Sequence, residues 1–142
     1  MSAPLASILA SFGRTASPAG IFLATAAICA GPVVHAEDLG QDALRDIVED
    51  TTWVAEGGWG FWSWAGDNKV CVRVYTADGD CSDTGSWSIE NAALCYELEW
   101  WGEPYGLRKN CLVVRALGEG RYETLAAGSA VDKAIFAFSV TD

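Results

Sequence analysis

The residues best able to do chemistry in this chain are carboxylates. Glu97 and Glu99 alternate along one predicted strand, so their side chains share a face, and Glu103 and Tyr105 follow closely. Two carboxyls about 5 Å apart are the acid and the nucleophile of a retaining glycosidase, but that reaction also needs a substrate cleft. Adjacent acids on the outer face of a strand are ordinarily a solvated surface, so we expect no catalysis from this pair.

Other catalytic arrangements lack a partner. The only histidine, His35, lies in a segment that we interpret below as a signal peptide, which removes Ser-His-Asp and Cys-His catalysis and histidine metal ligands from the mature chain. Ser129 and Lys133 do not have S-x-x-K spacing, and no Gly-rich segment joins a strand to a helix as a phosphate loop. The acids at 78–80 and Asp83 lack the glycine of an EF-hand loop and are typical of a turn. We predict a non-enzymatic protein without metal or cofactor.

Residues 1–36 have the layout of a secretory signal peptide. They hold one basic residue, Arg14, and no acid, and an apolar run over Ala19–Ala30 leads to Val-His-Ala before Glu37. The run is shorter than the roughly 20 apolar residues of a spanning helix, and no later stretch is longer. We predict a signal peptide over 1–36 and a mature chain of residues 37–142, periplasmic or secreted, with no transmembrane segment. An uncleaved anchor is the alternative.

The mature chain is strongly acidic. Without residues 1–36 it keeps 8 Lys and Arg against 19 Asp and Glu, a formal charge of −11, in 106 residues, which is the size of one domain. Such a charge repels nucleic acid and anionic membranes, and it favours solubility or a basic partner.

Four cysteines remain in the mature chain, an even number that indicates two disulfides in an oxidising compartment. Three connectivities are open. Cys95 and Cys111 lie on two predicted strands whose midpoint falls in the W-G-E-P-Y-G turn, which favours their pairing across a hairpin and leaves Cys71 with Cys81 by exclusion. A four-thiolate zinc site is the competing interpretation, but no pair has the spacing of a zinc knuckle.

The apolar pattern predicts one helix followed by strands. A 3.6-residue period over Asp38–Glu49 predicts a short amphipathic helix, with Asp38 and Gln41 as a capping box. After Asp50 the period becomes 2, which predicts about eight short antiparallel strands. These strands lie around Thr51–Ala55, Trp59–Trp64, Val70–Tyr75, Ser86–Ile89, Leu94–Trp101, Cys111–Ala116, Arg121–Leu125 and Phe136–Val140. We expect a single all-β domain, an up-and-down barrel of about eight strands preceded by a short N-terminal helix.

An aromatic, Gly-rich stretch occupies residues 57–66. Strand alternation places Trp59 and Phe61 on one face and Trp62 and Trp64 on the other, so one pair is predicted inside the barrel and the other outside or under the helix. The same alternation applies to Trp100 and Trp101, of which one is predicted to point inward and the other outward.

A set of motifs resembles a known family. The segments D-G-D-C-S-D-T-G-S-W-S-I, L-C-Y-E-L and N-C-L-V-V-R are similar to those of lipocalin-like proteins of unknown function exported by Gram-negative bacteria. Gly85 and Trp87 ahead of Leu94 and Cys95, with Cys111 opening the next strand, carry the resemblance, which covers about 51–125. It implies an eight-stranded barrel whose interior can hold a small apolar ligand.

We therefore predict an exported barrel that binds a small apolar or amphipathic ligand at an aromatic mouth, with Trp59, Phe61 and Trp100 inside or near the rim. The alternative is an acidic protein-binding module that inhibits a basic hydrolase such as a lysozyme through outward tryptophans such as Trp62 and Trp101.

Overall fold

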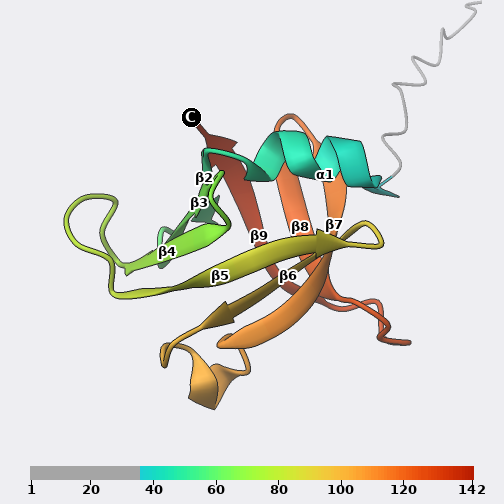
Figure 1. The fold of residues 1–142 in the computed structure, drawn as a ribbon. Helices are drawn as coiled ribbons and strands as arrows, with labels where there is room; N and C mark the ends of the chain where they lie inside the picture. The colour runs from blue at the N-terminus through green and yellow to red at the C-terminus, as the bar shows by residue number, and fades with distance from the viewer. Residues whose placement is uncertain (1–35) are drawn as a thin grey trace, which may run out of the picture. The chain divides into compact units, whose positions relative to one another are not determined.

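The computed structural model describes residues 36–142 (Figure 1). The predicted signal peptide, residues 1–36, lies outside the described residues except for Ala36.

Eight strands form a closed antiparallel barrel. Each strand pairs with the next from β2 to β9, and β9 returns to pair with β2. The strands are β2 (Thr51–Ala55), β3 (Gly60–Ala65), β4 (Lys69–Val74), β5 (Asp83–Glu90), β6 (Ala93–Leu98), β7 (Lys109–Gly118), β8 (Arg121–Ala126) and β9 (Ala134–Thr141). The prediction of an all-β, up-and-down barrel of about eight strands is confirmed.

The N-terminal segment differs from the prediction. A two-residue strand, β1 (Glu37–Asp38), pairs with β7 before the helix α1 (Gln41–Val48) begins, so the helix follows a strand and does not precede the whole barrel. The predicted capping box is wrong, because the N-cap is Gly40 and makes no side-chain cap bond. The Asp38 carboxylate instead accepts a hydrogen bond of 2.9 Å from Arg115 Nε, which holds β1 on β7.

The helix packs on β2, β5 and β6 and contributes two fully buried side chains, Leu44 and Val48, to the barrel core. Its last turn is tied to β2, since the carbonyl of Ile47 accepts hydrogen bonds from Thr51 Oγ1 at 2.6 Å and Trp53 Nε1 at 2.7 Å. The helix therefore covers the barrel end at which β2 begins.

Aromatic rings fill the interior. Trp53 stacks on Phe138 with 3.9 Å between ring centroids, and Trp62 lies parallel to Trp64 at 5.8 Å and edge-on to Tyr96 at 5.1 Å. The indole N–H groups of Trp62 and Trp64 are buried with no hydrogen-bond partner in the described part of the chain. Burying about 200 Å² of each indole stabilises the fold by about 5 kcal/mol, which exceeds the roughly 1–3 kcal/mol cost of one unpaired donor.

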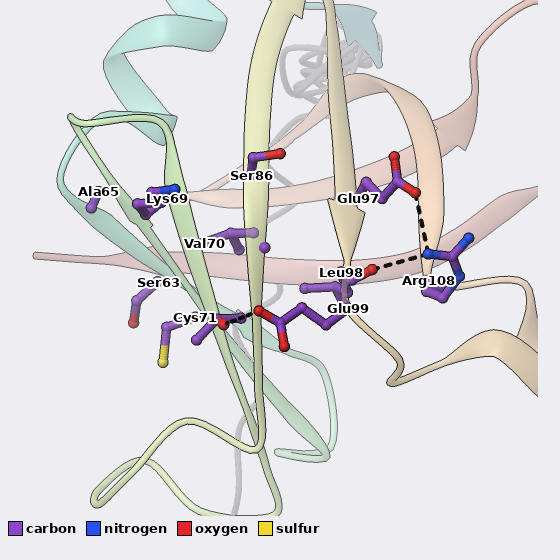
Figure 2. A pocket seen from close by; sticks show the side chains of 12 residues that line it. Ser63, Ala65, Lys69, Val70, Cys71, Ser86, Glu97, Leu98, Glu99 and Arg108 are labelled. Carbon is purple, nitrogen blue, oxygen red and sulfur yellow. Dashed lines mark hydrogen bonds and ion pairs between the residues drawn. The ribbon is translucent and has the colours of Figure 1, made fainter.

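Outward side chains of β3, β5 and β6 include the polar or charged Ser63, Ser86 and Glu97 (Figure 2). Gly85 allows β5 and β6 to approach on the inner side, because a Cβ there would lie 2.0 Å from the backbone oxygen of Glu97.

Both predicted disulfides are present. Cys95 and Cys111 are direct partners across β6 and β7, as the hairpin argument predicted. Cys71 on β4 bonds to Cys81 at the end of the loop that leads to β5. The first bond links neighbouring strands, and the second ties a loop to the barrel wall.

Candidate ligand-binding end of the barrel

The connections between strands differ at the two ends of the barrel. In an up-and-down barrel successive connections alternate between ends, and here 66–68, 91–92 and 119–120 are short turns at the end covered by α1. The connections at the other end are longer and comprise 56–59, 75–82, 99–108 and 127–133. We call these four loops the open end.

The exposed large apolar side chains belong to these long loops. Among the described residues, the large hydrophobic side chains that are exposed are Tyr75 (81%), Trp100 (62%), Tyr105 (77%) and Val131 (65%). All four belong to the long loops, and Tyr105 lies in a short 3₁₀ helix, η1 (Glu103–Tyr105). Loops that join the strands of a rigid scaffold frequently carry the binding residues of a protein.

Two half-buried tryptophans lie between these loops and the core. Trp59 and Trp101 are nearly parallel, with 6.2 Å between ring centroids and an interplanar angle of 20°. Trp59 also meets Phe136 edge-on at 5.6 Å, and Trp101 meets Trp62 at 5.9 Å. The pair therefore joins the exposed loop residues to the interior aromatic rings.

The structure corrects which aromatic side chains point inward. Trp62 and Trp64 are fully buried in the core, whereas Phe61 lies on the outer wall opposite Val54 and Arg73. Phe61, which we expected inside the barrel or near its rim, does not point inside, and the outward position of Trp62 in the alternative hypothesis is wrong. A period of 2 separates the faces of β3 but does not say which face meets the core.

The tryptophan pair at the end of β6 is also reversed. Trp101 packs against the core cluster and Trp100 is exposed, whereas we expected Trp100 to be the inner side chain and Trp101 the outer one. Of Trp59, Phe61 and Trp100, which we expected inside or near the rim, Trp59 packs against the core from the open end.

A buried carboxylate fixes the backbone of this pair. Asp83 is 4% exposed, and its Oδ2 accepts hydrogen bonds from the backbone N–H groups of Trp100 at 2.9 Å and Trp101 at 2.7 Å. Its Oδ1 accepts from the N–H of Thr84 at 2.8 Å. We interpreted Asp83 as a turn residue from its neighbours, although counting back by twos from the inward Trp87 places it inside the barrel.

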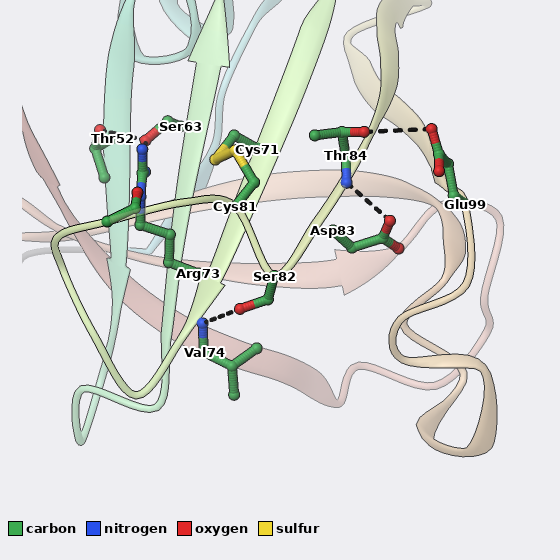
Figure 3. Close-up of a disulfide and its surroundings, with 11 residues drawn as sticks. Thr52, Ser63, Cys71, Arg73, Val74, Cys81, Ser82, Asp83, Thr84 and Glu99 are labelled. Carbon is green, nitrogen blue, oxygen red and sulfur yellow. Dashed lines mark hydrogen bonds between the residues drawn. A yellow bond between two sulfur atoms is a disulfide. The ribbon is translucent and has the colours of Figure 1, made fainter.

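The loop that carries Tyr75 is held at several points (Figure 3). The Cys71–Cys81 disulfide closes it, Arg73 Nε donates to the carbonyl of Gly79 at 2.8 Å, and the backbone N–H of Val74 donates to Ser82 Oγ at 3.1 Å. Tyr75 itself has a φ of 59°, a left-handed conformation that is unusual for a bulky residue. An exposed aromatic residue is thus presented on an anchored loop.

The carboxylates that suggested a glycosidase have other partners. Glu97 forms ion pairs with Lys109 at 2.9 Å and Arg108 at 3.2 Å, and hydrogen bonding to Lys109, followed by that to Arg108, holds the pKa of Glu97 below its ordinary value. A carboxyl with a lowered pKa is a poor proton donor at neutral pH. Glu99 accepts a hydrogen bond of 3.3 Å from Thr84 Oγ1.

Within residues 36–142, no three His, Cys, Asp or Glu side chains come together as a candidate metal site. No helix in this part of the chain is long and apolar enough to cross a membrane.

Comparisons of the chain with protein-family models, with curated proteins and with solved structures found no match.

Proposed function

We propose that the protein is an exported, non-enzymatic, lipocalin-like barrel that binds a small apolar or amphipathic ligand at its open end. The observation that carries the proposal is that the exposed Tyr75, Trp100, Tyr105 and Val131 all belong to the long loops between strands at one end of the barrel. Aromatic side chains bury a large area at little entropic cost, so they are effective contacts for an apolar molecule.

The contact surface follows from the packing. Aromatic rings fill the interior, so the ligand lies on the loops and on the half-buried Trp59 and Trp101, and not deep inside the barrel. Trp62, whose ring contacts that of Trp101, supports this surface from below and is buried from solvent.

Export is part of the proposal. Two disulfides fit an oxidising location, and the composition of residues 1–36 is that of a signal peptide. Mass spectrometry of the protein from its native compartment tests cleavage after Ala36.

Binding can be tested with the neutral fluorescent probe N-phenyl-1-naphthylamine. We expect saturable binding that changes little between low and high salt, because burial of apolar surface is not screened. Trp100→Ala together with Tyr105→Ala should weaken probe binding at least about tenfold, since two aromatic contacts of about 1 kcal/mol or more are lost. Phe61→Ala removes an aromatic ring from the outer wall and is the matched control. Equal affinities for the double variant and the control would refute the proposal.

A second function is favoured by charge. The open-end loop 75–82 carries Asp78 and Asp80, both exposed and without an ion-pair partner in the described part of the chain. Together with the predicted charge of −11, they suit a basic protein partner such as a lysozyme-type hydrolase. A pull-down that recovers a basic protein at low salt and loses it at high salt would support this alternative over the first.

A further inference from the structure

A groove lies on the outer wall of the barrel and reaches the open-end loop 99–108. It has a volume of 810 Å³ and is lined by residues of β3, β4, β5 and β6 and by Glu99 and Arg108 of that loop. This volume lies within the range of roughly 300–1,000 Å³ that is typical of small-molecule sites.

The groove has a polar floor between two charged sides. The outward residues of β5 that line it are Thr84 and Ser86, whose short side chains leave space above the strand. In the paired register Ser86 lies between Lys69 on β4 and Glu97 on β6 (Figure 2). The floor therefore offers hydroxyl groups, which both donate and accept hydrogen bonds.

Most of the charge on the β6 side is already neutralised. Glu97 pairs with Lys109 and Arg108, and Arg108 also pairs with Glu103. Glu99 has no ion-pair partner in residues 36–142, and its carboxylate accepts a hydrogen bond from Thr84 Oγ1. The free negative charge of the groove is therefore at Glu99.

The free positive charge is on the opposite side. Lys69 lines the groove from β4, its side chain is exposed, and it forms no ion pair within the described part of the chain. In the register Lys69 is level with Glu97, and Glu99 lies two residues further along, so Lys69 and Glu99 are separated by two strand spacings and two residues, about 12 Å. Each is thus available to a group of opposite charge on a bound molecule.

We propose that this groove binds a short peptide with free termini, of two or three residues. The peptide's carboxylate contacts Lys69, its ammonium group contacts Glu99, and its amide groups exchange hydrogen bonds with the hydroxyls of Thr84 and Ser86. An extended chain advances about 3.4 Å per residue, so two or three residues span the distance between the two charged side chains once these extend inward. The hydroxyl floor favours a peptide over other zwitterions, because a peptide group also both donates and accepts.

The test is an amide NMR titration of the full-length mature protein with its disulfides intact, using tri-alanine as the probe. We expect saturable shifts at Thr84 and Ser86 and weaker binding at high salt, since exposed charges are screened. N-acetyl-tri-alanine and tri-alanine amide should each bind about threefold more weakly, because each lacks one terminal charge in a solvent-exposed contact.

Matched variants assign each terminus. Lys69→Gln should weaken the binding of tri-alanine about threefold and leave the affinity for tri-alanine amide unchanged. Glu99→Gln should likewise weaken the binding of tri-alanine about threefold and leave the affinity for N-acetyl-tri-alanine unchanged. Lys133→Gln alters an exposed lysine in an open-end loop and should change neither. Absence of saturable shifts, or equal binding of the doubly blocked peptide, would overturn the proposal. Phosphocholine binding as tightly as tri-alanine would overturn the assignment to peptides.

The result is independent of the proposed function. Trp100→Ala should not alter tri-alanine binding, and Lys69→Gln should not alter binding of N-phenyl-1-naphthylamine. If the test of one proposed site gives a negative result, the proposal for the other site is not affected.

Discussion

Replacing Asp83 by Asn should destabilise the protein and loosen the open end. The buried carboxylate accepts three backbone hydrogen bonds, from Thr84, Trp100 and Trp101, at 2.7–2.9 Å. Asn keeps only one acceptor oxygen, and its NH2 group would face at least one of these N–H donors, so at least one bond is lost and the others lose the charge of their acceptor, about 1 kcal/mol for each of the three. We therefore expect a loss of about 3 kcal/mol in the free energy of unfolding, or a decrease of about 12 °C in Tm for a domain of this size.

Urea unfolding followed by tryptophan fluorescence measures this loss as a lower midpoint at an unchanged m-value. Asp80→Asn removes the same charge from an exposed residue of the neighbouring loop and controls for the change in net charge. Hydrogen exchange at the amides of Trp100 and Trp101 should accelerate in the Asp83 variant alone. A midpoint equal to that of the Asp80 variant would refute the view that this carboxylate organises the open end.

Three further predictions concern the barrel itself. Gly85→Ala should cost about 3 kcal/mol in unfolding free energy, since its Cβ would lie 2.0 Å from a backbone oxygen. Gly40→Ala, with nothing within 4 Å of the added Cβ, should cost under about 1 kcal/mol, because only the N-cap preference for Gly over Ala is lost. Equal effects in urea unfolding would refute this. Replacing Cys95 and Cys111 together by Ala should lower the unfolding free energy by about 3 kcal/mol, because the unfolded chain gains entropy once residues 16 positions apart are no longer cross-linked. An unchanged urea midpoint would contradict this. Burial raises the pKa of Tyr96 from 10.0 to about 12. Its contribution to the free energy of unfolding is therefore complete below pH 10 and is lost as the pH rises towards 12, because the unfolded chain ionises first; the loss is about 3 kcal/mol in all. Tyr96→Phe should flatten the urea midpoint between pH 9 and 11.5, and a slope like that of the unaltered protein would count against the raised pKa.

Much of the fold was predictable because it depends on local patterns. A two-residue apolar period places one side of each strand in a core, and turn residues between the strands impose an up-and-down order. The cysteine positions, equidistant from one turn, were enough to favour Cys95 with Cys111, and the structure has that pair in register.

The start of the chain could not be predicted in the same way. Glu37 and Asp38 have helix-compatible side chains, but pairing with β7 and the contact between Asp38 and Arg115, 77 residues away, outweigh the local capping preference. A capping box is worth about 1 kcal/mol, and a strand pairing together with an ion pair at a distant site can exceed it.

The sequence by itself determined the class of fold, the disulfide-bonding cysteines and the two faces of the aromatic strand. Only the tertiary structure decided that Trp62 and Trp64 face inward, that Trp101 and not Trp100 packs on the core, and that Asp83 holds both of their backbone amides. The physical reason is that alternation is a property of one strand, whereas the inner face is defined by the direction in which all eight strands close.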